Sequence, residues 1–399
     1  MKFKFKSGIS VCLLLCTLSS IAQINGVEKD KEKANLALIL SQPKNNKRIM
    51  NREIELVSSV ASSKDGKVIY LAWYSGGPDE GPGNYVTLSV STDGGNNWLN
   101  DQLVVFPKVS EARFFDPVLW RDKNDQVWLF SAVSKKTSSK SKKWDLRGGV
   151  YALPVTWDGK KVSHGEGKIL SYGIMMNKPF YSAPQDKVFF PSSIWRSDKD
   201  HPDKAAYIQD GTFIYSHDYK KSPKLGYLQE YSSIKAVEDS IRTFDEHQIV
   251  DVNGKGEFLA LVRTKDKNNA VYFSKSKDYG KSWTNLQPFT LVGPTASSRF
   301  HITRLQSGNL LLILNNSKKR TNMTAFISKD EGKTWPHKLL LDNRDKVSYP
   351  DADQDKNGVI HITYDRDRKG AKEINYCKIT EKDILEGDEK AIFKMRVNK

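Results

Sequence analysis

Short apolar runs, each preceded by a turn signal, are the main pattern in this chain. They cover residues Val68–Trp73, Gln126–Phe130, Phe258–Val262, Asn309–Ile313 and Val359–Tyr364. Each run follows a turn sequence made of glycine, asparagine, aspartate or serine, which is typical of strands in antiparallel hairpins. Helical periodicity is nearly absent until Thr380, which is expected to cap a short helix over Glu381–Leu385 that ends at Gly387. The pattern predicts an all-β protein.

Three eight-residue segments repeat the pattern S-x-D-x-G-x-x-W, at residues 91–98, 276–283 and 328–335. The second and third start 52 positions apart, which matches one four-stranded propeller blade. The longer interval between the first and second leaves room for two or three further blades. In each segment the aspartate can accept backbone N–H bonds, the glycine permits a positive φ, and the tryptophan can pack between strands. The repeats therefore predict a six-bladed β-propeller, or a seven-bladed one, and are structural rather than catalytic.

The first 22 residues have the features of a signal peptide. Lysines alternate with phenylalanines up to Lys6, an apolar run covers Ile9–Leu18, and small residues precede Gln23. The run is too short to span a bilayer, so no transmembrane segment is expected. A lipoprotein anchor at Cys16 is the alternative. We expect an exported protein, periplasmic or extracellular, with a signal peptide at 1–22, an N-terminal segment at 23–50 and a catalytic propeller domain at 51–399.

Cysteine content and charge narrow the class of partner. Cys12 and Cys16 fall in the signal segment, so Cys377 alone remains and no intramolecular disulfide can form. The net charge is +16, and it falls to +13 when the three lysines of the signal segment are removed. Such a charge attracts polyanions. Outside the cytoplasm these are acidic glycans, whereas no nucleic-acid motif is present and no obligate protein partner is inferred.

The three repeats resemble the Asp-boxes of the sialidase superfamily, and the resemblance is strongest beyond Asp245. It implies that Glu246, Arg263, Arg320 and Tyr349 are site residues, because they follow the family's order of glutamate, arginine, arginine and tyrosine. Arginines can hold a sugar carboxylate bidentately. A glutamate beside a tyrosine can remove the phenolic proton and make the oxygen a nucleophile or base.

The chain departs from the sialidase pattern at two places. The strand expected to carry the first arginine of the family triad reads Ile54–Val60 and contains serines instead. Arg52 lies close in sequence but outside the motif. The family's acid/base aspartate would fall in the loop that contains Asp79, which is therefore the candidate for that role.

Other segments resemble a divergent branch of propellers that degrade polysaccharides, including enzymes that act on glucuronate next to rhamnose. Several are lyases, which need a cation for the uronate carboxylate and a tyrosine or histidine pair as base and acid. The candidate substrate-binding residues are Arg263, Arg320, Arg299, Arg196, Asn177 and Lys178, and the candidate catalytic residues are Tyr349, Glu246, His301, Asp79, Tyr181 and His247. A buried, fully hydrogen-bonded histidine is the structural alternative for His247 and His301. No histidine pair has metal-ligand spacing with acidic neighbours, so no metal or other cofactor is expected.

Three functions are compatible with these residues. The first is elimination at a uronate in an acidic polysaccharide, sulfated or rhamnose-rich such as an ulvan-like one. The second is exo-acting glycoside hydrolysis of the sialidase type with Tyr349 as nucleophile. The third is non-catalytic glycan binding.

Overall fold

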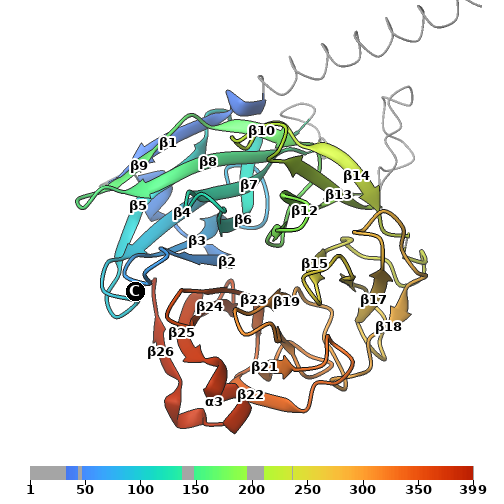
Figure 1. Cartoon of the computed structure of the whole chain (residues 1–399). Helices are drawn as coiled ribbons and strands as arrows, with labels where there is room; N and C mark the ends of the chain where they lie inside the picture. The colour runs from blue at the N-terminus through green and yellow to red at the C-terminus, as the bar shows by residue number, and fades with distance from the viewer. Residues whose placement is uncertain (1–32, 44–46, 137–147, 196–210, 236, 399) are drawn as a thin grey trace, which may run out of the picture.

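Six small antiparallel sheets surround a central axis in the computed structural model of this chain (Figure 1). The structure describes residues 33–43, 47–136, 148–195, 211–235 and 237–398. The sheets form a six-bladed β-propeller, which confirms the all-β prediction and decides between six and seven blades. The predicted signal peptide and Arg196 lie outside the described residues.

The first three blades contain the N-terminal half of the chain. Blade 1 consists of β2 (Ile54–Ser62), β3 (Ile69–Gly76), β4 (Tyr85–Ser91) and β5 (Leu99–Pro107), with β1 (Ala37–Ser41) paired outside β5. Blade 2 consists of β6 (Ala112–Arg121), β7 (Val127–Lys135), β8 (Val150–Trp157), β9 (Val162–His164) and β10 (Lys168–Ser171). Blade 3 consists of β11 (Phe180–Ser182), β12 (Lys187–Ile194), β13 (Gly211–Asp218) and β14 (Gln229–Ser233). The segment before residue 51 thus adds β1 to blade 1, and the short helix α2 (Lys47–Met50) follows it.

The last three blades contain the C-terminal half. Blade 4 consists of β15 (His247–Asp251), β16 (Phe258–Arg263), β17 (Val271–Ser276) and β18 (Gln287–Pro288). Blade 5 consists of β19 (His301–Arg304), β20 (Leu310–Asn315), β21 (Met323–Ser328) and β22 (His337–Asp342). Blade 6 consists of β23 (Val347–Gln354), β24 (Val359–Arg366), β25 (Glu373–Thr380) and β26 (Phe393–Arg396).

The five apolar runs of the sequence are all second strands of blades, namely β3, β7, β16, β20 and β24. Their residues are almost entirely buried because neighbouring blades cover both faces of each sheet. Blade 3 has the same arrangement, but its second strand, β12, contains Pro191 followed by two serines. That interruption hid β12 from the sequence pattern.

The three Asp-boxes connect the third and fourth strands of blades 1, 4 and 5. In the third box, Asp330 accepts a hydrogen bond from the backbone N–H of Thr334 at 2.9 Å and from its hydroxyl at 2.6 Å. The Thr334 and Ser328 side-chain and backbone donors lower the pKa of Asp330 to about 2. The carboxylate is close to the surface, not deeply buried, and Trp335 packs beneath it at 6% exposure. The turn geometry supports the structural role predicted for these motifs.

The ring closes where blade 1 meets blade 6. Backbone N–H groups of β2 at Val57, Val60 and Ser62 donate hydrogen bonds of 2.8–3.0 Å to three carboxylates of blade 6, those of Asp365, Asp351 and Asp353 respectively. Charge-assisted bonds of this kind are stronger than those between neutral groups. The closure therefore uses side-chain to backbone bonds between two sheets, each built from one end of the chain.

The predicted C-terminal helix is confirmed. Helix α3 (Glu381–Glu386) begins after Thr380, whose side chain and that of Asp383 form a capping box, and it ends at Gly387 with a φ of 68°. It connects the third and fourth strands of blade 6, where three other blades have an Asp-box. Across the described ranges, helices long and apolar enough to cross a membrane are absent.

Each blade begins with its inner strand, so all six inner strands run in the same direction along the axis. Their starts form one mouth of the propeller, here called the first mouth, together with the ends of the second strands. Their ends and the hairpins that follow form the opposite mouth, here called the second mouth.

Candidate active site

Tyr349 is placed at the first mouth by an interruption in strand β23. Pairing between β23 and β24 shifts register between Ser348 and Asp351, and Tyr349 has a φ of 56°. A left-handed residue in a bulge turns a side chain away from the regular alternation of a strand. The phenol ring is 6% exposed and lies at the centre of the residues described below.

The hydroxyl of Tyr349 is shared by a glutamate and an arginine. It donates to Glu246 Oε1 at 3.0 Å and accepts from Arg263 Nη1 at 2.7 Å. The same Arg263 nitrogen lies 2.7 Å from Glu246 Oε1. The other carboxylate oxygen, Glu246 Oε2, is buried and has no hydrogen-bond partner in the described part of the chain. Sequence reasoning named all three residues, and the fold brings them into one hydrogen-bonded group.

The resting protonation of this group follows from its surroundings. Burial raises the pKa of Glu246, but Arg263, Arg299 and the Tyr349 hydroxyl together bring it below its usual value. Burial and the charge of Glu246 raise the pKa of Tyr349, and this effect exceeds the opposing influence of the arginines. At neutral pH the glutamate is therefore ionised and the tyrosine protonated, which is the state needed for proton transfer from phenol to carboxylate.

Three further arginines surround the Tyr349 ring. The guanidinium carbons lie 4.1 Å (Arg368), 5.1 Å (Arg320) and 5.2 Å (Arg299) from the ring centre. Among the described residues, Arg320 makes one hydrogen bond, at 3.3 Å to the carbonyl of Ser297, which leaves most of its donors for a ligand. Arg299 instead donates to the carbonyls of Met176 and Ser58 and is only 2% exposed. Arg320 is thus suited to bind a carboxylate, whereas Arg299 forms the floor beneath it.

Arg368 was not among the candidates from the sequence. It follows β24, and its Nε and Nη2 atoms both lie 3.1 Å from Asp365 Oδ2. Its backbone carbonyl accepts a hydrogen bond from the N–H of Glu55 on β2. The guanidinium therefore reaches the region beside β2 in which the sialidase resemblance expected an arginine from blade 1. Linear spacing does not show that blade 6 closes against blade 1.

Asp116 is a second residue that sequence reasoning missed. It lies in β6 at the same kind of interruption as Tyr349, with a φ of 46° and a register shift between Phe115 and Val118. Its side chain is buried, and burial together with the charges of Glu80 and Glu246 raises its pKa to about 7. A visible signal exists, because Asp116 and Tyr349 each directly precede a proline in an inner strand.

His301 and Lys178 lie below the tyrosine and meet at Asp351. His301 Nδ1 is 3.1 Å from Asp351 Oδ1, and Lys178 Nζ is 2.8 Å from Asp351 Oδ2. Lys178 also donates to the carbonyls of Val60 and Leu119. All of these groups are buried, and burial lowers the pKa of His301 despite the nearby carboxylate. They link five of the six blades across the axis, all but blade 4, and lie between the two mouths.

The remaining candidates lie away from Tyr349. Asp79 is exposed and pairs with Lys369 at 3.0 Å. Tyr181 is on β11 at the second mouth, where its hydroxyl donates to Asp186 at 2.7 Å. His247 is buried beside the carbonyls of Asp245 and Phe213, and burial lowers its pKa to about 4.

Asn177 donates from Nδ2 to the carbonyl of His247 at 2.8 Å, which links blade 3 to blade 4. Within the described residues, clusters of three or more histidine, cysteine, aspartate or glutamate side chains that could hold a metal ion are absent.

Aromatic side chains lie beside the arginine cluster. Phe244 is 47% exposed and packs against Trp195, with ring centres 5.7 Å apart, and Arg263 lies 5.3 Å from the Phe244 ring centre. Trp195 in turn contacts the ring of Phe115, the residue before Asp116. An exposed aromatic surface of this kind can cover the apolar face of a sugar.

Comparison with known proteins agrees with this architecture. No curated protein sequence matches the chain. Among solved structures, the sialidase NanB of Streptococcus pneumoniae superposes with a TM-score of 0.59 at 12% identity, over 86% of this chain and 71% of that one. A leech intramolecular trans-sialidase, solved with 2,7-anhydro-Neu5Ac, gives a TM-score of 0.61 at 13% identity, over 87% and 71%.

A protein of unknown function from Dyadobacter fermentans gives a TM-score of 0.56 at 18% identity, over 79% of this chain and 92% of that one. Identities this low show a shared fold. The sequence model of the BNR repeat-like domain matches residues 67–362, which include all three Asp-boxes and most of the six blades. The chain therefore belongs to the BNR repeat-like domain family and has its sialidase-like propeller fold.

Proposed function

We propose that this protein is a glycoside hydrolase that removes a terminal, carboxylate-bearing sugar from a glycan, with Tyr349 as the nucleophile. The observation that carries the proposal is the Tyr349 hydroxyl, bonded at once to Glu246 and Arg263. A phenol in contact with an ionised carboxylate can transfer its proton as its oxygen attacks the anomeric carbon. A structural tyrosine would not require four arginines around its ring.

The arginines define the substrate class. Arg320 and Arg368 approach the ring from the open mouth, and Arg263 lies against the hydroxyl. Guanidinium groups bind carboxylates through paired hydrogen bonds, and this preference is stronger than that of lysine. If a sugar has a carboxylate next to its anomeric carbon, the carboxylate would contact the arginines while the anomeric carbon lies above the phenol oxygen of Tyr349.

Asp116 is the residue best suited to protonate the leaving group. A carboxyl with a pKa of about 7 is protonated in about half of the molecules at neutral pH, and in that form it can give its proton to the glycosidic oxygen as that bond breaks. The resulting carboxylate can then take a proton from the water that cleaves the tyrosyl-sugar bond, which regenerates the acid. Asp79, the candidate from sequence, is paired with Lys369 at the surface.

Elimination at a uronate is the second candidate function, because β2 contains serines, not arginine, where the sialidase resemblance expects the first arginine of the triad. In that reaction the Tyr349–Glu246 pair would remove the C5 proton and Asp116 would protonate the group that leaves C4. The tyrosine and histidine pairs considered from sequence are not assembled, because His301 is bonded to Asp351 beneath the floor. Non-catalytic glycan binding is the third candidate.

One product analysis separates these functions. The protein would be incubated with methylumbelliferyl glycosides of sialic acid and of uronic acids, and with ulvan as a rhamnose- and glucuronate-containing sulfated polymer. Release of a saturated acidic sugar supports hydrolysis. A new ultraviolet-absorbing unsaturated uronate would instead establish elimination, and binding without product would establish a lectin-like role. Tyr349→Phe is the control that must remove either product.

A further inference from the structure

The second mouth contains a cavity of about 480 Å³ that is separate from the Tyr349 site. It lies at the ends of inner strands β6, β15, β19 and β23, whereas Tyr349 lies near the start of β23. Asp353 lies four positions beyond Tyr349 in β23, which corresponds to about 13 Å of extended chain. The buried group of Lys178, Asp351 and His301 lies between them. The cavity volume is within the range of small-molecule sites.

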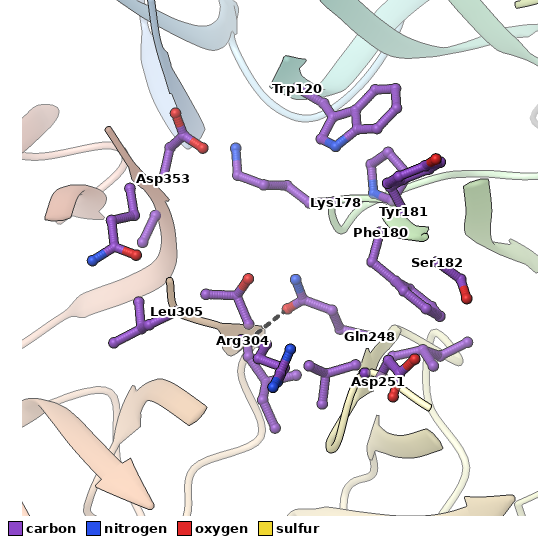
Figure 2. A pocket seen from close by; sticks show the side chains of 18 of the residues that line it. Trp120, Lys178, Phe180, Tyr181, Ser182, Gln248, Asp251, Arg304, Leu305 and Asp353 are labelled. Carbon is purple, nitrogen blue, oxygen red and sulfur yellow. Dashed lines mark hydrogen bonds between the residues drawn. The ribbon is translucent and has the colours of Figure 1, made fainter. Parts of the chain in front are cut away.

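Three aromatic side chains form one side of the cavity (Figure 2). Trp120 is held by contacts with Phe130 and Phe190, and Phe180 stacks on Phe189, so neither ring is free to collapse into the space. Tyr181 is held by its hydrogen bond to Asp186. Rigid aromatic walls favour a ligand with an apolar face.

Polar groups on the other sides have unused hydrogen-bonding capacity. Gln248 is only 2% exposed, and its Oε1 accepts from the N–H of Ile302, while its Nε2 has no partner among the described residues and faces the cavity in Figure 2. Asp353 Oδ2 accepts two bonds from Ser62, which leaves Oδ1 available. The guanidinium of Arg304 is exposed and makes no hydrogen bond within the part of the chain that is described. An amide donor held in place by the bond to Ile302 and open to the cavity can donate to a ligand without a change of position.

The charges around this cavity are mixed, in contrast to the arginine cluster at the first mouth. Asp251 and Asp353 are acidic, whereas Arg121 and Arg304 are basic and the ammonium of Lys178 is already paired with Asp351. Arg121 is itself paired with Asp125 at 3.1 Å. An anion would meet two carboxylates, and a cation would meet two guanidinium groups. A sugar hydroxyl can donate to Asp353 and accept from Gln248 at the same time.

We infer that the second mouth is a binding site for a neutral saccharide, distinct from the site that holds the acidic sugar. The site combines an aromatic wall with an amide donor, a carboxylate acceptor and a guanidinium. These groups are complementary to a sugar ring, which has many hydroxyl groups and one apolar face. Such a site would hold a neutral part of a glycan on the opposite side of the propeller from the reacting end.

The test uses the mature protein and a panel of neutral sugars, namely rhamnose, galactose, glucose, xylose and their short oligomers, with glucuronate and galacturonate for comparison. Binding would be measured by saturation-transfer NMR and titration calorimetry. We expect at least one neutral sugar to bind, and both Asp353→Asn and Gln248→Glu to weaken it by about tenfold, as expected for one lost hydrogen bond to a charged or buried group. Lys255→Gln, on an exposed loop of the same face, is the matched control and should not change the affinity.

Tyr349→Phe distinguishes this site from the proposed catalytic one, because it should abolish turnover without changing neutral-sugar binding. The inference is overturned if no neutral sugar binds, if only the uronates bind, or if binding survives both Asp353→Asn and Gln248→Glu in variants with unchanged circular dichroism. It is also overturned if Tyr349→Phe removes the binding, since the sugar would then occupy the first mouth.

Discussion

The guanidinium of Arg368 lies 4.1 Å from the centre of the Tyr349 ring, and its hydrogen bonds to Asp365 hold it there. A cation over an aromatic face is stabilised by the ring's quadrupole. The same positive charge stabilises the phenolate. Burial and Glu246 raise the pKa of Tyr349, and Arg263, Arg368 and Arg320 partly offset this increase. Arg368 therefore acts on the Tyr349 oxygen through electrostatics, while Asp365 of the same blade holds its guanidinium.

Tyr349→Phe is expected to lower turnover by roughly 10² to 10⁴-fold, the range for loss of a proton-transfer group, or more if the oxygen is a nucleophile. The ring and its arginine contacts remain, so affinity for the substrate and the melting temperature should be nearly unchanged. Steady-state kinetics and thermal denaturation on the same preparation check both. A fully active Tyr349→Phe would show that the reacting group lies elsewhere at the first mouth.

Arg320→Lys keeps a positive charge and loses the planar pair of donors. Within the described part of the chain Arg320 has a single long bond, at 3.3 Å to the carbonyl of Ser297, so the loss should fall on the substrate. We expect kcat/KM to decrease by about tenfold to a hundredfold, the equivalent of one or two charge-assisted hydrogen bonds. Arg304→Lys at the second mouth is the matched substitution and should leave kcat/KM unchanged. Equal effects of the two variants would contradict the assignment of the reaction to the first mouth.

Asp330→Asn should destabilise blade 5 without affecting turnover. The carboxylate accepts several short bonds within its turn, and because it is near the surface we expect a loss of about 1–2 kcal/mol in the free energy of unfolding. The pKa of about 2 lies below the unfolded value of about 3.9, so this contribution is present above pH 4 and is lost as the pH falls towards 2.

Denaturant unfolding at neutral and acid pH measures this difference. Glu331→Gln, in the same turn and exposed, is the control and should leave stability nearly unchanged. A loss of activity in Asp330→Asn at unchanged stability would mean that the Asp-box has a catalytic role.

The fold could be predicted from sequence because its signals are local. The Asp-boxes, the second-strand apolar runs and the Thr380 helix cap each depend on neighbouring residues, and each appears in the structure where the pattern placed it. Tyr349, Glu246 and Arg263 were accessible for a related reason, since the family resemblance fixes their order along the chain. Their convergence at the first mouth follows from the common direction of the inner strands.

The rest of the site depends on strand register and on contacts between blades, which spacing along the chain does not show. Arg368 reaches Tyr349 because β23 and β24 pair within blade 6, with a register shift at Tyr349. The turn that carries Arg368 is in addition held by the backbone N–H of Glu55 on β2, at the opposite end of the chain. His301 and Tyr181 are candidates of the same kind as Tyr349 in the sequence, but they lie at different depths along the axis. His301 is bonded to Asp351 beneath the Tyr349 site, and Tyr181 lies at the second mouth. Asp116 precedes a proline in an inner strand, as Tyr349 does, but its burial and its raised pKa follow from the register shift in β6 and from packing.

Asp116 gives the proposed function a characteristic pH dependence. If it protonates the leaving group, the active form is the protonated one, and kcat/KM should fall as the pH rises through about 7. Asp116→Asn should be much less active and should lack this alkaline decrease, because an amide does not titrate. Asp79→Asn is the control. It changes an exposed aspartate whose pKa is lowered by hydrogen bonds from the backbone N–H of Glu80 and from Lys369. This variant should keep both the activity and the decrease in kcat/KM at alkaline pH.

Stability provides a second, independent measurement of the same group. The pKa of Asp116 is raised from about 3.9 in the unfolded chain to about 7 in the folded one, so the folded state binds the extra proton between these values. The contribution of Asp116 to stability is therefore most favourable below pH 4 and decreases as the pH rises towards 7, because a buried carboxylate must then form. Asp116→Asn removes this cost, and its melting temperature should decrease less than that of the wild type between pH 5 and pH 8. Identical pH profiles of melting temperature in the two proteins would show that Asp116 ionises normally in the folded state, and the acid would then have to be sought among the other carboxyl groups of the first mouth.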